Sequence, residues 1–363
     1  MRILWIGKGS VNPAGGDEVY DRKVLAFIRE THDVDIFHPE PATRLKRLIN
    51  LAAGIPIHRA SYYTRENVIQ LKRLIAKVPY DAVVTSWEPF DFLANYSKRN
   101  IVILHNMTSD AICQIFPENL IARLYSARVR RWESKLYRRH NIAALIVLSQ
   151  RDADIVRQHC DIDPIVAHPG SPPQADLSDM AEFKPEIVIS GTYDWLPKRR
   201  DLKRLAHLYS QLNNRPKVRY DVAMPRSIMD KLTPKTIHQH EFKEAIRIGI
   251  IPDTFSAGHK LKSTFYIAQN CVVASFSDVA SDFRGLPHSA LFIRRVRTMS
   301  DLAQLQAELE AMDPQQLRDL FSEFKEACLR RFDWQLTAAT ISKAIESIDR
   351  RAATNPEPSA SLH

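Results

Sequence analysis

Short apolar runs alternate with helix-like segments along most of this chain, and that alternation restricts its fold more than any other feature. The first run, "RILWIG", ends in a glycine, and similar runs follow at 33–39, 81–86, 100–106 and 144–149. Runs of this kind are typical of buried parallel strands, which need long, usually helical, crossover connections. We therefore expect an α/β fold with a doubly wound parallel sheet.

The same pattern restarts in the second half of the sequence. The stretch "PGSPPQADLSDMAEFKP" (169–185) is rich in proline and polar residues, which is typical of a linker between domains. Apolar runs then recur at 186–191, 218–224, 246–252 and 271–275. The prediction is two Rossmann-like domains that face a central cleft, where ligands of open α/β sheets bind.

The predicted boundaries follow from these patterns. Residues 1–170 form the N-terminal Rossmann-like domain, 171–185 the linker and 186–332 the C-terminal Rossmann-like domain. From Ser300 to about Arg351 the pattern is helical, and the polar residues 352–363 are expected to be disordered.

The net charge indicates the kind of partner that the protein binds, and the cysteines indicate the compartment in which it works. The net charge of +9 favours anionic partners such as nucleotides, nucleic acid or an acidic membrane surface. The four cysteines are widely spaced, and we expect reduced, mostly buried thiols of a cytosolic protein. The chain shows neither an apolar run long enough to span a membrane nor the apolar core of a signal peptide.

Two basic segments lie where helices of the second domain are expected to begin. In "IIPDTFSAGHKLKSTFYIAQNCVVAS" (250–275), Gly258 ends a loop, and Lys260 and Lys262 stand at the start of the next helix. A helix N-terminus attracts anions, so two added lysines indicate an anionic ligand. A solvated basic turn is the alternative.

The stretch "SGTYDWLPKRRDL" (190–202) has the same character. Gly191 ends a strand, and Lys198 and Arg199 lie in the first turn of the following helix. We expect both basic segments to bind the same anion. A solvent-facing basic patch is the alternative.

Candidate residues of the first domain lie after its first strands. Gly15 and Gly16 belong to a glycine-rich loop that is neither GxGxxG nor a P-loop, and we expect it to let the backbone approach a phosphate or an acceptor sugar. His105 and Asp110 follow the strand at 100–106, where either could act as a base, and Glu88 follows the neighbouring strand. A flexible turn and a structural histidine are the alternatives.

No metal site is predicted. Of the three Asp-x-Asp pairs, the one at 33/35 alternates within an expected strand and the one at 152/154 lies at a helix start, and the sequence has no HExxH motif and no Cys/His cluster.

Two segments are both basic and apolar. Residues 119–140 carry many Arg and Lys side chains among leucines and aromatic residues, and 43–56 is similar. Helices of this kind commonly lie on anionic membranes. Nucleic-acid binding and an ordinary surface helix are the alternatives.

Four segments, in order, resemble GT-B glycosyltransferases of the family 4 type. "WESKLYRRHNIAALIVLSQRDADIV" resembles the region before their linker, and "ISGTYDWLPKRRDL" the opening of their second domain. The 248–275 segment is similar to their donor-binding segment, and "RFDWQLTAATISKAI" to their C-terminal region. The resemblance implies the GT-B fold and a helix at 333–351 that crosses back to the first domain.

One departure from the family pattern concerns its two donor-binding glutamates. They should fall at Ala257 and Phe265, so the E-x7-E pair is absent. The resemblance leaves Lys262 as the best diphosphate contact. The same departure is expected of xanthan-type glucuronosyltransferases, which are membrane-associated enzymes with an aspartate base.

The resemblance implies a metal-independent glycosyltransferase at the inner face of the membrane. It would transfer a sugar from a nucleotide donor, a UDP-sugar, to a lipid-linked or polysaccharide acceptor in exopolysaccharide or cell-surface glycan synthesis. The nucleotide sugar is a substrate, so no cofactor is expected, and neither is nucleic acid. A non-catalytic binding or scaffold subunit and a nucleotide-sugar epimerase are the alternatives.

Overall fold

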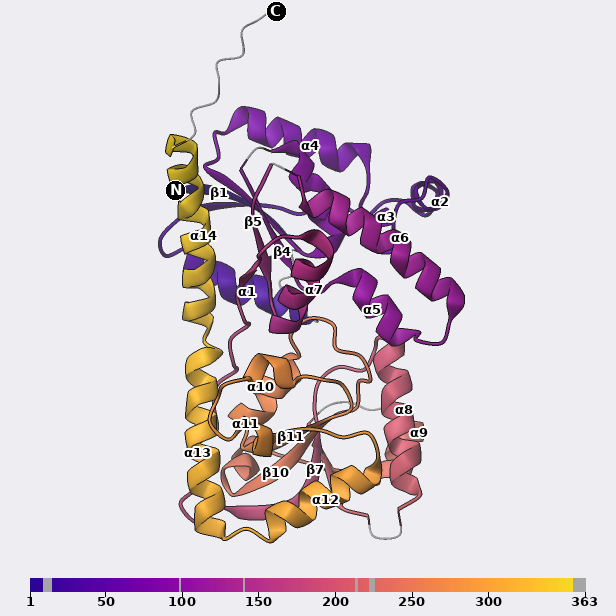
Figure 1. The fold of residues 1–363 in the computed structure, drawn as a ribbon, viewed down its shortest axis with the longest axis vertical. Helices are drawn as coiled ribbons and strands as arrows, with labels where there is room; N and C mark the ends of the chain where they lie inside the picture. The colour runs from indigo at the N-terminus through magenta and orange to yellow at the C-terminus, as the bar shows by residue number, and fades with distance from the viewer. Residues whose placement is uncertain (9–14, 98, 140, 213–214, 222–225, 355–363) are drawn as a thin grey trace, which may run out of the picture. The chain divides into compact units, whose positions relative to one another are not determined.

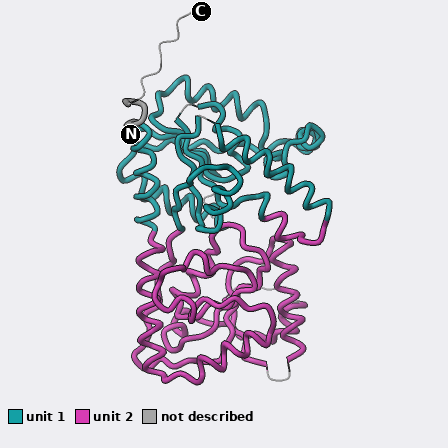
Figure 2. Tube along the Cα trace, in the orientation of Figure 1, with its two compact units in different colours: residues 1–110, 120–168, 334–363 teal, residues 111–119, 169–333 magenta. Residues whose placement is uncertain are grey.

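The computed structural model describes residues 1–8, 15–97, 99–139, 141–212, 215–221 and 226–354. It divides into two compact units, shown in different colours in Figure 2. The first unit comprises residues 1–110, 120–168 and the C-terminal segment from residue 334, and the second comprises 111–119 and 169–333.

The first unit is built on a six-stranded sheet in which all neighbouring strands are parallel. In spatial order its strands are β2 (Asp33–Phe37), β1 (Arg2–Ile6), β3 (Ala82–Ser86), β4 (Asn100–Leu104), β5 (Ile142–Val147) and β6 (Ile165–Val166). The chain leaves β1 toward β2 on one side and later returns to β3 on the other. The switch point, where ligands of such sheets bind, therefore lies between β1 and β3.

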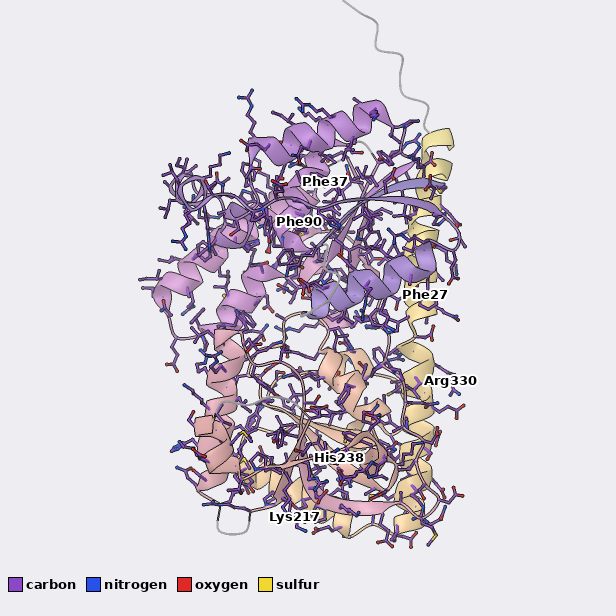
Figure 3. All side chains as sticks on the ribbon, turned by 180° about the vertical axis from the view of Figure 1, so that it is seen from behind. Phe27, Phe37, Phe90, Lys217, His238 and Arg330 are labelled. Carbon is purple, nitrogen blue, oxygen red and sulfur yellow. The ribbon has the colours of Figure 1, made fainter. Side chains whose placement is uncertain are left out.

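Alternate residues of these strands face two helical layers. One face packs against α1 (Gly16–Ile28) and α14 (Trp334–Thr354), which lie side by side in Figure 1. On the other face, Phe37 and Phe90 (labelled in Figure 3) belong to one core cluster. The remaining helices of this unit are α2 (Arg44–Ala52), α3 (Ile57–Ala60), α4 (Arg65–Lys77), the 3-10 helix η1 (Glu88–Tyr96), α6 (Leu120–Tyr137) and α7 (Gln150–Cys160). Helix α5 (Thr108–Ile115) begins in the first unit, and its residues from 111 belong to the second.

The second unit repeats the plan. Its strands, again all parallel, are β12 (Ile293–Arg295), β11 (Cys271–Ser275), β10 (Ala245–Ile251), β7 (Glu182–Ile189), β8 (Lys217–Tyr220) and β9 (Lys235–Thr236). The order reverses between β7 and β10, which places the switch point there.

A single core cluster joins the second sheet to its helices. These are α8 (Leu196–Ser210), α9 (Arg226–Leu232), η2 (Gln239–Lys243), α10 (Leu261–Ala268), η3 (Ala280–Phe283), α11 (Ser289–Phe292), α12 (Met299–Glu310) and α13 (Pro314–Arg331). The fold class predicted from the sequence, two Rossmann-like parallel-sheet units, is confirmed.

The differences from the predicted elements are local. The strand expected at 218–224 ends at Tyr220, and residues 222–224 lie outside the described residues. The short strands β6, β9 and β12 were not predicted, because two or three residues carry no periodicity. Within the stretch expected to be a linker, the buried Ala175 donates its backbone N–H to the carbonyl of Ala268 at 2.9 Å. The tail expected to be disordered lies outside the described residues from 355 onward.

Candidate active site

The candidate donor site lies at the switch point of the second sheet. Gly191 follows β7, Asp253 follows β10, and Lys260 and Lys262 stand at the start of α10. Because β7 and β10 are neighbours, their carboxyl ends bring these side chains together.

One carboxylate stands between two lysines there. The Nζ of Lys260 donates to Asp253 Oδ2 at 3.2 Å, and the Nζ of Lys262 lies 3.9 Å from Asp253 Oδ1. Lys260 also lies over the ring of Phe255 at 4.1 Å, and Lys262 over the ring of Tyr193 at 3.9 Å. Such cation–π contacts stabilise ammonium groups that have lost water.

Burial sets the electrostatics of this cluster. It lowers the pKa of Lys262 to about 8, and the charge of Asp253 opposes that shift. Burial alone would raise the pKa of Asp253, but the charges of Lys260 and Lys262 outweigh it and hold that pKa below its usual value. The Nζ of Lys262 is buried and donates no hydrogen bond to any of the described residues. A buried ammonium without an acceptor is costly, and an anionic ligand would supply one.

Gly191 gives Lys262 the space it occupies. Gly191 has a φ of +90°, and a Cβ at this position would lie 2.6 Å from the Cε of Lys262. The Tyr266 hydroxyl accepts the backbone N–H of Ser190 at 2.9 Å and donates to the Ile250 carbonyl, which fixes the ends of β7 and β10 together.

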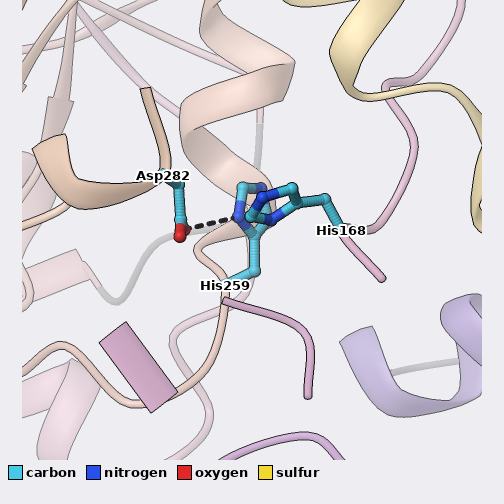
Figure 4. Close-up of side chains that lie close together, drawn as sticks. All are labelled: His168, His259 and Asp282. Atoms are coloured by element: carbon cyan, nitrogen blue, oxygen red, sulfur yellow. Dashed lines mark hydrogen bonds and ion pairs between the residues drawn. The ribbon is translucent and has the colours of Figure 1, made fainter. Parts of the chain in front are cut away.

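The loop between β10 and α10 is held by hydrogen bonds on both sides. Buried Asp201 accepts from the backbone N–H of Thr254 at 2.8 Å, and Gln114 exchanges two hydrogen bonds with the backbone of Ser256. His259 Nδ1 pairs with Asp282 Oδ2 at 2.8 Å (Figure 4). Gly258 completes the loop with a φ of +66°, a conformation that suits glycine.

The two cations predicted on α8 differ in their placement. Lys198 lies in the first turn, near enough to the lysine pair that its charge lowers the pKa of Lys262. For Arg199 the described residues supply no ion pair, and its Nε is buried without a hydrogen-bond acceptor. The structure therefore brings Lys198, but not Arg199, into the lysine cluster.

The positions of the missing glutamates are occupied by apolar side chains. Phe265 packs against the core of the second unit and contacts Phe242 edge-on at 6.4 Å between ring centroids. Neither Phe265 nor Ala257 has a carboxylate to hold a ribose or a sugar hydroxyl.

In the first unit, His105 follows β4 and lies beside the carboxyl end of β3, one of the two strands at the switch point. It is 9% exposed, and its Nε2 lies 3.0 Å from the Oγ of Ser86, which donates to Asp21 Oδ1 at 2.5 Å. The ring of Tyr20 contacts the imidazole edge-on at 5.0 Å. Burial lowers the pKa of His105 to about 4, so the ring is neutral at pH 7.

The start of α1 is acidic. Gly15 is the N-cap residue, Gly16 begins the helix, and Asp17 and Glu18 lie in the first turn. Asp17 pairs with Lys8 at 2.9 Å. Carboxylates at a helix N-terminus occupy the position that a bound phosphate would take, so this end suits a neutral hydroxyl ligand better than a phosphate. The preceding residues 9–14 of the glycine-rich loop lie outside the described residues.

The other two candidates of the first unit have protein partners. Glu88 is 2% exposed and accepts the backbone N–H of Asn106 at 2.6 Å, and burial raises its pKa to about 8. This position holds the turn after β4 and argues against direct contact with an acceptor. Asp110 pairs with Arg151 at 2.9 Å.

The basic, apolar segments form helices with an unusual surface. Helix α2 has no buried residue, and its Leu45, Leu48 and Ile49 are each more than half exposed. Helix α6 exposes Leu120, Ile121 and Leu124 to a similar degree. We call these six residues the α2–α6 surface. None of the described helices is long and apolar enough to cross a membrane.

Sequence reasoning missed three side chains that matter for these sites. Asp253 follows a strand as His105 does, so the same argument could have found it. Ser86 ends a predicted strand without a chemical signal, and Asp21 lies within α1, where only the packing shows that it faces the sheet.

Comparisons with known proteins bear on the family and on the fold. Residues 15–174 match the family described as Glycosyltransferase Family 4. We call residues 15–174 the Family 4 region, after the family that they match. The resemblance predicted from the sequence is thereby confirmed, and no curated protein matches the chain significantly in sequence.

Solved structures extend the likeness beyond the Family 4 region. A glycosyltransferase from Rickettsia africae ESF-5 is 11% identical with a TM-score of 0.62, covering 96% of this chain and 98% of its own. The lipopolysaccharide outer core galactosyltransferase WaaB is 11% identical with a TM-score of 0.55, covering 96% and 99%. An E. coli structure described as trehalose-6-phosphate bound with UDP-2-fluoro glucose is 12% identical with a TM-score of 0.54, covering 95% and 99%. The fold is GT-B, and with the Family 4 region it supports a glycosyltransferase.

Proposed function

We propose that this protein transfers a sugar from a UDP-sugar to a hydroxyl of a lipid-linked or polysaccharide acceptor, in exopolysaccharide or cell-surface glycan synthesis. The observation that carries the proposal is Lys262, whose buried ammonium at the switch point lacks an acceptor among the described residues. A nucleotide diphosphate supplies both the negative charge and the acceptor oxygens that this position needs.

The donor proposal has support from a structural neighbour. The E. coli structure of the same fold is bound with UDP-2-fluoro glucose. In this chain the diphosphate would contact Lys262, Lys198 and the N-terminus of α10, with Gly191 allowing close approach of the backbone.

These cations also have a role in the chemical step. As the bond between the sugar and the diphosphate breaks, negative charge develops on the leaving oxygen. Fixed ammonium groups in a buried site stabilise that charge, so we propose that transfer needs no metal ion. Activity that disappears with EDTA and returns with Mg²⁺ or Mn²⁺ would contradict this point.

The first unit would bind the acceptor and remove its proton. Of the two candidate bases, His105 is neutral at pH 7, whereas Asp110 is held by Arg151. The acceptor oxygen attacks the anomeric carbon, its proton passes to His105, and UDP departs with the electrons of the broken bond.

A lipid-linked acceptor would require this unit to meet a membrane. The α2–α6 surface presents six large apolar side chains on two helices that also carry exposed arginines, a combination that binds anionic bilayers. We therefore propose a peripheral location on the inner face of the membrane.

The deciding experiment is incubation of the purified protein with a panel of nucleotide sugars. Hydrolysis or transfer, strongest with a UDP-sugar, is the expected result. Binding without turnover would instead identify a scaffold subunit, and interconversion of the sugar would identify an epimerase.

A further inference from the structure

Three buried side chains connect helix α1 to His105. Asp21 comes from α1, Ser86 ends β3, and His105 follows β4. Asp21 is 3% exposed and Ser86 is fully buried, so water does not compete for the two hydrogen bonds that join them to the imidazole.

We propose that Asp21 is a positioning residue that acts through Ser86 to keep the proton of His105 on Nε2 and leave Nδ1 as the proton acceptor. The role of His105 as base rests on the proposed function. The arrangement of protons within the three residues does not.

The argument follows from the number of protons available. The Ser86 hydroxyl has one proton, and an ionised Asp21 can only accept. That proton is therefore donated to Asp21, and the Ser86 oxygen must accept its second hydrogen bond from an Nε2–H group of His105. A protonated Asp21 can donate to Ser86 instead, which frees the serine proton for Nε2 and moves the imidazole proton to Nδ1.

The surroundings of Asp21 bring this change within reach of ordinary pH. Burial raises the pKa of Asp21 to about 7, hydrogen bonding from Ser86 and from the Lys8 backbone opposes the rise, and the charge of Asp17 adds to it. His105 itself stays neutral over the same range, because burial lowers its pKa to about 4. The proton therefore changes its place on the ring without changing the charge of the ring.

Two other charged groups near the imidazole, Asp17 and Lys8, have opposite charges. The carboxylate of Asp17 and the ammonium of Lys8 act on the pKa of His105 in opposite directions and pair with each other at 2.9 Å. Neither hydrogen bonds to Ser86 or His105 in the described part of the chain. Among the described residues none donates to or accepts from His105 Nδ1, so Ser86 alone selects the tautomer.

The glycine after β1 leaves room for this arrangement. A Cβ on Gly7 would lie 2.5 Å from Asp21 Oδ2, so any larger residue there would displace the carboxylate.

The test is NMR of the protein with labelled histidine rings, since ring nitrogen and carbon shifts distinguish the two neutral tautomers. The chain has 13 histidines, and the variant His105→Gln identifies the signals of His105 by their loss. At pH 8 we expect the Nε2–H tautomer in the parent protein. Below about pH 7 the population should move toward Nδ1–H.

Two variants should remove the preference at pH 8, and one should keep it. Ser86→Ala and Asp21→Asn are expected to give a mixture or the Nδ1–H form. Asp17→Asn changes a carboxylate on the same helix that is outside the hydrogen-bonded chain, and should leave the tautomer as it was. Thermal unfolding of each variant shows whether it is folded, and either of the first two is sufficient if the other is not.

The result does not depend on catalysis. An Nδ1–H imidazole in the parent at pH 8, or an unchanged tautomer in a folded Ser86→Ala protein, would overturn the proposal. If the tautomers behave as expected but His105→Gln still transfers sugar at the parent rate, the positioning stands and only the assignment of His105 as base fails.

Discussion

The two sheets share a strand plan but differ in charge at their carboxyl ends. In the second unit, Lys260 and Lys262 surround one carboxylate at the switch point. In the first, the strand ends carry a neutral imidazole, the protonatable Asp21 and an Asp17 carboxylate that is paired with Lys8. The first unit bears its excess positive charge elsewhere, on the exposed faces of α2 and α6. The difference teaches that topology determines where a ligand binds, whereas the side chains at the strand ends determine which ligand.

The sharpest test of this comparison is His105→Gln. Glutamine keeps an N–H that can reach Ser86 but has no basic nitrogen. We expect turnover to fall by about 10²- to 10⁴-fold, the usual contribution of a positioned base, with the Kd for UDP unchanged. His240→Gln, an exposed histidine of the second unit, is the control. Retained activity would transfer the role of base to Asp110, and Asp110→Asn would then be the variant to measure.

A second test asks whether positive charge on the surface of the first unit, and not of the second, attaches the protein to anionic membranes. Replacing four exposed arginines of α2 and α6 with glutamine should release the protein from anionic vesicles, because each contributes about 1 kcal/mol near such a surface. The residues are Arg44, Arg47, Arg123 and Arg131.

The matched control removes the same number of charges from the second unit. It replaces four exposed lysines with glutamine: Lys203, Lys217, Lys231 and Lys235. Co-sedimentation with anionic vesicles should decrease only for the variant that lacks the four arginines. The parent protein should leave the vesicles in 1 M salt, where the Debye length is about 3 Å. Equal losses in both sets would mean that net charge, and not the α2–α6 surface, drives attachment.

Lys262→Met tests the cationic edge directly. Methionine keeps most of the aliphatic stem that packs on Gly191 but removes the ammonium. We expect the affinity for UDP to fall by about 1.5–3 kcal/mol, the value of a charge-assisted hydrogen bond. Lys217→Met, at an exposed lysine of β8 (Figure 3), should leave calorimetric binding unchanged. Unchanged affinity in Lys262→Met would remove the donor site.

The pH dependence of UDP binding tests whether the positive charge of Lys262 contributes to the affinity for UDP. Because the pKa of Lys262 is lowered to about 8, the ammonium loses its proton as the pH rises through that value. Affinity for UDP should therefore decrease between about pH 7 and pH 9 in the parent and change less in Lys262→Met. An equal decrease in both would assign the titration to another group.

The smallest expected effect is that of Gly191→Ala. Both Gly191 and Gly285 have positive φ angles, so alanine at either should cost about 1–2 kcal/mol of unfolding free energy. Only at Gly191 would the new Cβ meet Lys262, whereas at Gly285 nothing lies within 4 Å. Weaker UDP binding in Gly191→Ala, but not in Gly285→Ala, would show that the glycine serves the lysine. The same UDP affinity in both variants would show that it does not.

Much of the fold could be predicted from the sequence, because its longer strands are specified by apolar runs of a few neighbouring residues. Runs such as those at 100–106 and 271–275 are long and apolar enough to identify buried strands, and β4 and β11 lie there. A helix start beside Lys260 and Lys262, and Lys198 in the first turn of the helix after Gly191, were predicted from equally local signals, and α10 and α8 begin there. The strands of two or three residues had no local signal and were missed.

By itself, the sequence determined two parallel sheets, the longer strands in each of them and the cations that follow β7 and β10. Short-range patterns decide these features, because apolar period and helix-start residues act over a few positions. Only the tertiary structure decided that Lys262 lies against Gly191, that Asp253 stands between two lysines and that Asp21 reaches His105 through Ser86. Those contacts join residues far apart in the sequence, and burial, which sets their pKa values, exists only once the sheet and its helices have packed together.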